Sequence, residues 1–279
     1  MEHSEWTERQ DETTVTVDGH ELTMAYQEFD GGAEPPVVFI HGIPTWGYLW
    51  RDIAPEVGED HHVVVPDMVG YGNSSMHDGF DRSIRAQEQA LEDLLDHLGF
   101  EEVVLAAHDI GGGVALRYAA HNPEEVVGLV MSNAVCYGSW PVEFISDLGL
   151  PDTTEMPLDQ LEQTVGGAFE AGVYDEADDE FVEGMVAPWI GEEGRTSLSR
   201  DAVSTNTNHT TELDYDAIDT ELLCLWGAQD EFQPIEFGYD LVDDLGGEMV
   251  ELDAYHWLPY DRSEEYVEHF QEFVTESIG

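Results

Sequence analysis

Basic residues are the scarcest class in this chain of 279 residues. Lysine is absent, and eight arginines face 62 aspartates and glutamates, which gives a formal net charge of −54. Self-repulsion at this density destabilises a compact fold in dilute buffer, whereas at about 1 M salt the Debye length falls to roughly 3 Å and the repulsion is screened. The acids are spread along the whole chain, so the composition predicts adaptation to a salt-rich cytosol, as in halophiles. It argues against nucleic acid and anionic membrane surfaces as partners.

Cysteines and long apolar runs are also scarce. Cys136 and Cys224 lie in or beside apolar segments, so we expect them to be buried and not to form a disulfide framework. No apolar run approaches the ~18 residues of a membrane-spanning helix. Residues 1–14 are acidic and lack the basic and apolar regions of a signal peptide. These features predict a soluble cytoplasmic protein, and a hydrophobic share of 42% is sufficient for one large core.

Short apolar strands alternate with helical stretches on both sides of one long interruption. Strands are expected at 14–17, 21–29, 37–40, 62–66, 103–107, 125–132, 222–226 and 248–252. Helices are expected at 47–56, 83–98, 112–121, 234–245 and 263–277. Strands joined by helical crossovers predict an α/β fold whose mostly parallel sheet carries helices on both faces. We expect residues 1–136 and 213–279 to form this core domain.

The interruption, residues 137–212, has helical stretches at 158–171 and 180–187 but no strand pattern. Its six large aromatic residues argue for a folded unit against a loose acidic loop; they are Trp140, Phe144, Phe169, Tyr174, Phe181 and Trp189. The insertion follows a strand that ends near Ser132, and ligands bind at the carboxyl ends of strands in such sheets. The segment is therefore predicted to be a helical cap over the active site.

The strand at 103–107 leads into a turn with Asp109 at its centre. Ala107 and Gly111 flank this aspartate at two residues' distance, and a helix follows. Small residues at these positions fit the strained strand–turn–helix of a nucleophile elbow, which projects the central side chain above the sheet. A carboxylate there is suited to attack an electrophilic carbon and to form an ester that water must then break. Asp109 is therefore the predicted nucleophile.

Two further residues complete the order nucleophile, acid, histidine. Asp230 lies just past the strand at 222–226, in a Gly-x-x-Asp-x-x-x-Pro frame that favours it over its neighbour Glu231. His256 follows the strand at 248–252. Since both lie at strand ends, they are predicted to join Asp109 at one edge of the sheet as the supporting acid and the general base.

The same edge is predicted to hold an oxyanion hole. His41-Gly42-Ile43-Pro44 follows the strand at 37–40, and the backbone N–H of Ile43 can act together with that of Ile110. His108 is expected to be a packing residue and not a second base. His61 and His62 have no partners at ligand spacing, and the glycines after Asp109 lack the lysine of a phosphate-binding loop, so neither a metal nor a cofactor is predicted.

These motifs resemble the aspartate-nucleophile branch of the alpha/beta-hydrolase superfamily, which holds haloalkane dehalogenases and epoxide hydrolases. The resemblance covers essentially the whole chain from Val15. The segment from His41 to Arg51 is similar to the dehalogenase version of its loop, and residues 67–74 match the family pattern Asp-x-x-Gly-x-Gly-x-Ser. Some dehalogenases place the acid after the sixth strand, but that position lies near Asn133, which cannot ionise.

The resemblance implies cleavage of carbon–halogen bonds in small apolar substrates, with water as the second reactant. Dehalogenases of this branch typically have tryptophan directly after the nucleophile, whereas this chain has Ile110, and Ile43 stands where they often have Asn or Glu. Cap residues are the candidate replacements. The predicted substrate contacts are Trp46, Tyr137, Trp140 and Trp189.

Two alternatives remain open. Epoxide hydrolysis would use two cap tyrosines to protonate the opening ring, and Tyr137 and Tyr174 are available, although their spacing does not match well. A different small-molecule hydrolase or a non-catalytic ligand receptor with this fold is the other alternative. The oligomeric state does not follow from the sequence.

Overall fold

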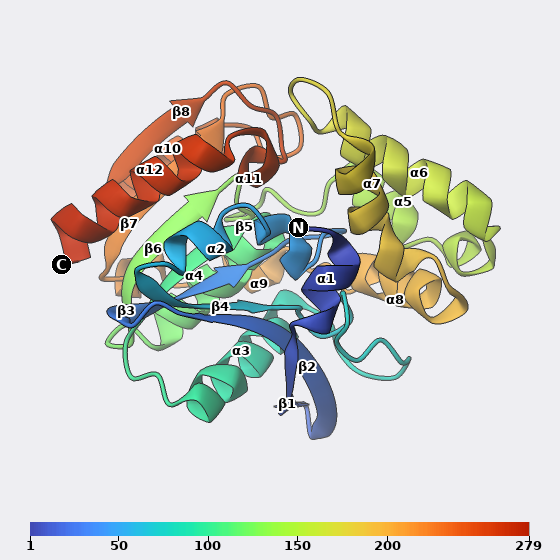
Figure 1. Cartoon of the computed structure of the whole chain (residues 1–279), viewed down its shortest axis with the longest axis horizontal. Helices are drawn as coiled ribbons and strands as arrows, with labels where there is room; N and C mark the ends of the chain where they lie inside the picture. The colour runs from blue at the N-terminus through green and yellow to red at the C-terminus, as the bar shows by residue number, and fades with distance from the viewer. Residues whose placement is uncertain (279) are drawn as a thin grey trace.

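A single twisted sheet forms the centre of the computed structural model, which describes residues 1–278 (Figure 1). Its eight strands are β1 (Asp11–Val17), β2 (His20–Asp30), β3 (Ala33–Ile40), β4 (His61–Pro66), β5 (Val103–His108), β6 (Val126–Ser132), β7 (Glu221–Gly227) and β8 (Glu248–Leu252). They lie in the order β1-β2-β4-β3-β5-β6-β7-β8. β2 pairs antiparallel with β1 and β4, and every other neighbouring pair is parallel, which confirms the predicted sheet.

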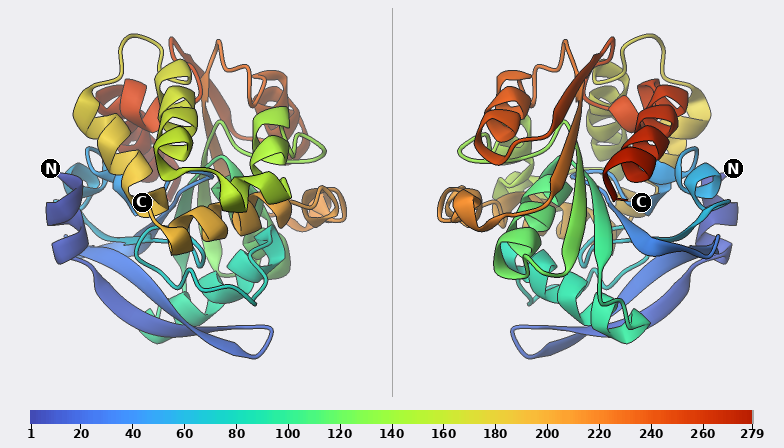
Figure 2. Two further views of the ribbon diagram at one scale, coloured as in Figure 1. Left: turned by 90° about the vertical axis from the view of Figure 1, so that its right-hand side faces the viewer. Right: turned by 90° about the vertical axis from the view of Figure 1, so that its left-hand side faces the viewer.

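Helices cover both faces of this sheet (Figure 2). One face carries α3 (Ile84–Leu98), α4 (Ile110–His121) and α10 (Glu236–Leu245), and the other carries α2 (Ala54–Val57) and α12 (Ser263–Phe273) with its continuation η5 (Val274–Ile278). Every residue of β5 is buried, because both of its faces are covered. Such strands are expected to be apolar, as β5 is from Val103 to Ala107. The arrangement confirms the predicted α/β fold.

Two segments near the N-terminus differ from the prediction. The predicted helix at 47–56 is two short elements, η1 (Gly47–Trp50) and α2, separated by a turn. Pro55 has no amide hydrogen to donate to a preceding turn, so a helix can begin around it but cannot continue through it. A short helix, α1 (His3–Glu8), precedes β1 in an acidic stretch for which no element was expected, and its Trp6 is buried in the core.

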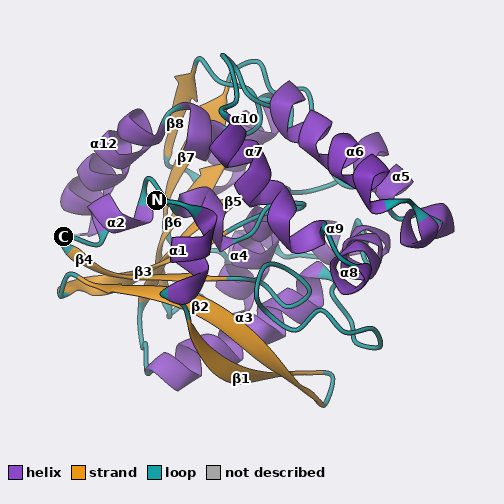
Figure 3. Ribbon diagram, turned by 45° about the vertical axis from the view of Figure 1, so that its right-hand side comes forward, coloured by secondary structure: helices purple, strands orange, loops and turns teal. Residues whose placement is uncertain are grey.

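The chain between β6 and β7 is helical, with no strand in the described residues 133–220. It contains α5 (Glu143–Leu148), η2 (Pro151–Glu155), α6 (Leu158–Ala171), α7 (Asp179–Val186), η3 (Ala187–Trp189), α8 (Glu192–Val203), α9 (Asn208–Thr211) and η4 (Tyr215–Ala217). Figure 3 shows α5 to α8 gathered beside the sheet. They contact the loops that follow β3 and β4, where Trp189 Nε1 donates to the Pro44 carbonyl and Ser197 Oγ to that of Gly70. These helices therefore lie over the strand ends that carry the predicted site.

Candidate active site

Asp109 occupies the tight turn between β5 and α4. Its backbone has φ 51° and ψ −125°, a left-handed conformation that a non-glycine residue adopts only under strain. The turn needs small neighbours: a Cβ added to Gly111 would lie 2.5 Å from the His41 carbonyl oxygen, and one added to Gly112 would lie 2.4 Å from the Ala134 Cβ. The sequence pattern around Asp109 thus has a steric cause, and the turn presents its carboxylate at the carboxyl edge of the sheet.

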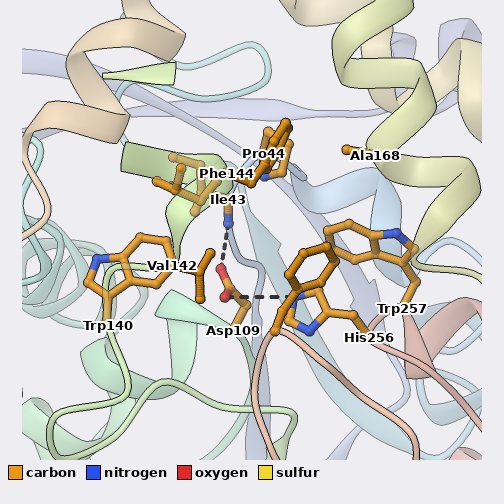
Figure 4. A pocket seen from close by; sticks show the side chains of 11 residues that line it. Ile43, Pro44, Asp109, Trp140, Val142, Phe144, Ala168, His256 and Trp257 are labelled. Carbon is orange, nitrogen blue, oxygen red and sulfur yellow. Dashed lines mark hydrogen bonds and ion pairs between the residues drawn. The ribbon is translucent and has the colours of Figure 1, made fainter. Parts of the chain in front are cut away.

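The two carboxylate oxygens of Asp109 have different surroundings. Oδ1 accepts a hydrogen bond of 2.8 Å from the Ile43 N–H, whereas Oδ2 lies 3.7 Å from Nε2 of His256 (Figure 4). Burial raises the pKa of Asp109, and His256 with the N–H groups of Ile43 and Ile110 opposes this rise. Oδ1 is therefore held by the loop after β3, and Oδ2 faces His256.

His256 lies between Asp109 and Asp230. Its Nδ1 is 2.8 Å from Asp230 Oδ2, so Nδ1 carries the proton and Nε2 faces Asp109. Burial lowers the pKa of His256, but the charge of Asp230, its hydrogen bond and the charge of Asp109 outweigh this, and the pKa is raised. Glu231, the rival acid, is exposed. The structure therefore brings Asp109, His256 and Asp230 into one chain of contacts.

Asn133 contacts Asp230, at the other end of this chain of contacts from Asp109. Its Nδ2 donates to Asp230 Oδ2 at 2.6 Å, and its Oδ1 accepts from the Gly227 N–H at 3.2 Å. Asn133 is buried and has a positive φ of 45°, which aims its side chain at the loop after β7. The sequence indicated this position only as one that cannot ionise. Its function as a donor to the acid follows from the tertiary structure.

A small cavity adjoins Asp109. It is lined by Ile43, Pro44, Asp109, Trp140, Val142, Phe144, Ile145, Ala168, Phe232, His256 and Trp257. Asp109 and His256 are the only ionisable residues in this lining. Trp257 Nε1 donates to the Phe169 carbonyl, and Figure 4 shows the Trp140 nitrogen on the side away from Asp109. The cavity therefore suits a small, neutral and largely apolar molecule.

Of the four predicted substrate contacts, Trp140 alone lines the cavity. Trp46 and Trp189 are buried elsewhere, and their Nε1 groups donate to the carbonyls of Gly184 and Pro44. Tyr137 stacks on Tyr215 with ring centroids 4.4 Å apart, and its hydroxyl donates to Asp244. These three side chains join the cap to the core and do not face Asp109.

The sequence analysis did not predict several residues that line the cavity, among them Phe144, Ala168, Phe232 and Trp257. Trp257 and Phe232 follow His256 and Asp230 by one and two positions, and this proximity is the signal that identifies them in hindsight. Phe144 and Ala168 have no such signal. The sequence pattern of a cap helix does not distinguish an aromatic or small residue that faces a cavity from one that packs against another helix.

His108 is a buried neighbour of the base. Its Nδ1 donates to the Ser132 carbonyl at 3.0 Å, and its ring centroid is 4.8 Å from that of His256. Burial lowers the pKa of His108 well below its usual range, so the ring is neutral and packs against His256.

Within residues 1–278 no group of three or more His, Cys, Asp or Glu side chains is arranged to hold a metal ion. Among the helices of this range, none has the length and apolar character needed to cross a bilayer.

Part of this sequence is similar to known proteins. A family profile described as alpha/beta hydrolase fold matches residues 35–183. The chain is 35% identical over 130 residues to a cis-3-alkyl-4-alkyloxetan-2-one decarboxylase of Shewanella oneidensis, covering 46% of this chain and 37% of the relative. It is 31% identical over 117 residues to haloalkane dehalogenase 2 of Mycobacterium bovis, covering 42% of this chain and 40% of the relative. The matched region thus spans about two fifths of each relative's length.

Structural similarity extends further along the chain. An alpha/beta hydrolase fold protein from Burkholderia ambifaria superposes with a TM-score of 0.84 at 26% identity, covering 93% of this chain and 97% of that one. The predicted resemblance to the dehalogenase-like branch is confirmed by the sequence matches. The chain belongs to the alpha/beta hydrolase fold family.

Proposed function

We propose that this chain is a hydrolase that uses Asp109 to displace a leaving group from a saturated carbon, and that its substrates are small, neutral haloalkanes. One observation carries the proposal: Asp109 Oδ1 is held by the Ile43 N–H while Oδ2 faces His256 Nε2 in an apolar cavity. A nucleophile and a base so placed serve two successive steps.

In the first step, Asp109 Oδ2 attacks the carbon that bears the halogen. A carbon–oxygen bond forms, the carbon–halogen bond breaks, and the halide leaves with the bonding electron pair. No proton is transferred, so His256 is not needed. The apolar lining keeps water away from Oδ2, which leaves the carboxylate more reactive than in solution.

In the second step, His256 Nε2 takes a proton from a water molecule that attacks Cγ of Asp109. Negative charge develops on Oδ1, where the N–H groups of Ile43 and Ile110 stabilise it. Asp230 stabilises the imidazolium through Nδ1. Collapse of the intermediate releases the product alcohol, which receives the proton from His256. It leaves Asp109 as a carboxylic acid, and loss of the second proton of the water to solvent regenerates the carboxylate.

Haloalkanes are favoured over epoxides by the cap tyrosines. An opening epoxide needs a proton donor at its oxygen, but the Tyr137 hydroxyl is bonded to Asp244, and neither Tyr137 nor Tyr174 lines the cavity. A halide leaves without a proton. The Trp257 nitrogen donates to the Phe169 carbonyl and the Trp140 nitrogen lies on the side away from Asp109, so we expect weakly basic leaving groups to be preferred, with iodide and bromide ahead of chloride. The dehalogenase relative supports this substrate class.

The test measures bromide and alcohol formed from 1-bromobutane in molar potassium salt, with 1-iodobutane, 1-chlorobutane and styrene oxide in parallel. Wild type is expected to release bromide and 1-butanol in equal amounts, and the Asp109→Ala variant to release neither. Diol from styrene oxide without bromide release would favour epoxide hydrolysis. Because one relative is named for an oxetan-2-one, a dialkyl oxetan-2-one is included, and turnover of this compound alone would replace the haloalkane assignment.

The site of action proposed here is a salt-rich cytosol, with water and a small molecule as the only reactants and no nucleic acid or membrane partner. The net charge of −54 supports this environment. Thermal unfolding in 0.1 M and 2 M KCl checks it: the melting temperature is expected to rise with salt as the self-repulsion is screened. A melting temperature that does not depend on salt would contradict it.

A further inference from the structure

A second hollow lies next to the active-site cavity, on the outer side of His256. It opens to the surface and is lined by Ala171, Gly172, Gln229, Asp230, Glu231, Phe232, Tyr255 and His256. Phe232 and His256 line both the hollow and the cavity, so their side chains form the partition between the two. Asp109 lies on the inner side of this partition and solvent on the outer side.

The two residues of the partition are held differently. His256 is fixed by its hydrogen bond to Asp230. Phe232 is anchored through its backbone, whose N–H donates to Asp230 Oδ1 at 2.7 Å. The Phe232 ring is partly exposed and meets the His256 ring edge-on, with centroids 5.3 Å apart. A rotation of the Phe232 side chain would therefore open the partition while the contacts among the catalytic groups stay in place.

Helix α6 borders both spaces. Ala168 lines the cavity, and Ala171 and Gly172, at the end of the same helix α6, line the hollow. These three residues are small, and the Trp257 indole packs on Gly172, where a Cβ would lie 2.3 Å from its Nε1. A route from the hollow to Asp109 thus runs between two large rings. Trp257 lies on the α6 side and is held by its hydrogen bond to the Phe169 carbonyl, whereas the Phe232 ring has no hydrogen bond to hold it.

We propose that the Phe232 ring is the gate between the hollow and the active site and determines which substrates reach Asp109. The inference rests on the proposed function and extends it to a substrate class. No arginine lines either space, and Glu231 lies at the rim of the hollow. Negatively charged substrates such as halocarboxylates are therefore repelled, whereas a neutral unbranched chain can extend past Phe232 into the hollow.

The first test does not require turnover. Diethyl pyrocarbonate is a small neutral reagent that acylates unprotonated imidazole nitrogen, and Nε2 is the free nitrogen of His256. Its rate of reaction with His256 is followed by peptide mass spectrometry in molar KCl, with exposed His20 as an internal reference. Phe232→Ala is expected to accelerate labelling of His256 by about tenfold or more, since a local opening step is removed. Phe232→Trp is expected to slow it.

Phe144→Ala is the matched control, because it makes the same change in the opposite, cap-side wall of the cavity and does not touch the hollow. It should enlarge the cavity without accelerating labelling. Circular dichroism verifies folding, and Phe232→Leu separates loss of the large ring from loss of packing, with an intermediate rate expected. If Phe144→Ala accelerated the labelling of His256 and Phe232→Ala did not, the proposal that Phe232 is the gate would be overturned.

The second test compares kcat/KM for 1-bromobutane and 1-bromodecane. Phe232→Ala is expected to raise the decane-to-butane ratio, and Phe144→Ala to change both values alike. An unchanged ratio in Phe232→Ala would refute control of chain length by this residue. If no variant and no wild type releases bromide, the haloalkane proposal fails, while the labelling rates still decide whether Phe232 is a gate.

Discussion

The active-site cavity has two unlike walls, one from the core and one from the cap. The core wall presents Asp109 and His256, whose polar atoms are held by Ile43, Asp230 and, behind them, Asn133. The cap wall is apolar and consists of Trp140, Val142, Phe144, Ile145 and Ala168. We propose that the difference reflects a division of function, in which the core supplies the reacting groups and the cap sets the size and polarity of the molecules that can meet them.

The two regions are joined by an unusual share of the few basic residues. Five of the eight arginines form ion pairs between residues 137–212 and the rest of the chain. These pairs are Arg82–Asp201, Arg85–Glu212, Arg117–Glu212, Arg200–Asp78 and Arg262–Asp175. Both regions are strongly acidic and repel each other, so cations at their junction offset the repulsion where it acts.

Substitution of Asp230, which holds His256 in the core wall, is expected to cause a large loss of activity. Asp230→Asn should lower steady-state turnover by about 10³- to 10⁴-fold, because His256 loses the partner that orients it and stabilises its protonated form. A burst of about one bromide per enzyme should persist, since the first step does not use the base. The matched control is Glu231→Gln, which removes the neighbouring exposed charge and should turn over like wild type. Impairment of the Glu231 variant alone would contradict the assignment.

The junction can be broken at its buried pair. Arg82 Nε lies 3.1 Å from Asp201 Oδ1, with both side chains almost completely buried. Arg82→Met leaves the Asp201 charge without a partner and should cost about 3–5 kcal/mol of unfolding free energy. Urea denaturation in molar KCl measures it, and the double variant Arg82→Met/Asp201→Leu should recover most of the loss. A double variant no more stable than the single one would contradict this account.

The same variant should show a defined pH dependence. Burial raises the pKa of Asp201, so without Arg82 the folded protein holds a proton that the unfolded chain releases at lower pH. The stability of Arg82→Met is therefore expected to fall as pH rises from the unfolded pKa of about 4 toward the folded value. Wild type at matched pH is the reference.

The base gives a kinetic pH test. His256 must be unprotonated to accept a proton from water, and its pKa is raised. Below that pKa, hydrolysis of the ester should slow by about tenfold per pH unit, with a midpoint above the ordinary value of about 6.5. The bromide burst should continue to lower pH, until Asp109 itself is protonated. Parallel loss of burst and steady-state rate would mean that the two steps share one titrating group.

The smallest effect is expected at an exposed pair of the same junction. Arg200 and Asp78 are about half exposed and 3.0 Å apart. Arg200→Gln should cost only about 0–1 kcal/mol, less at high salt, because water and ions screen the pair. Compared with Arg82→Met in the same urea assay, it isolates the effect of burial. An equal loss of unfolding free energy in both variants would contradict the expected difference between the buried and the exposed ion pair.

The sequence allowed the fold and the convergence of three residues to be predicted, for a physical reason. Parallel strands place their carboxyl ends at one edge, so Asp109, Asp230 and His256 had to meet once β5, β7 and β8 were recognised. The cavity lining could not be predicted in this way. Trp46 and Trp189 look like substrate contacts in the sequence, but their indole nitrogens meet the carbonyls of Gly184 and Pro44 only through tertiary packing.

The central claim is that Asp109 becomes covalently attached to the substrate, and intact-protein mass spectrometry of His256→Ala tests it most directly. The variant is incubated in molar KCl with 1-bromobutane and, separately, with styrene oxide. The account predicts a stable butyl adduct that peptide mapping locates on Asp109, because the first step proceeds and hydrolysis does not. A folded variant that carries no adduct, or an adduct on a residue other than Asp109, would contradict the account.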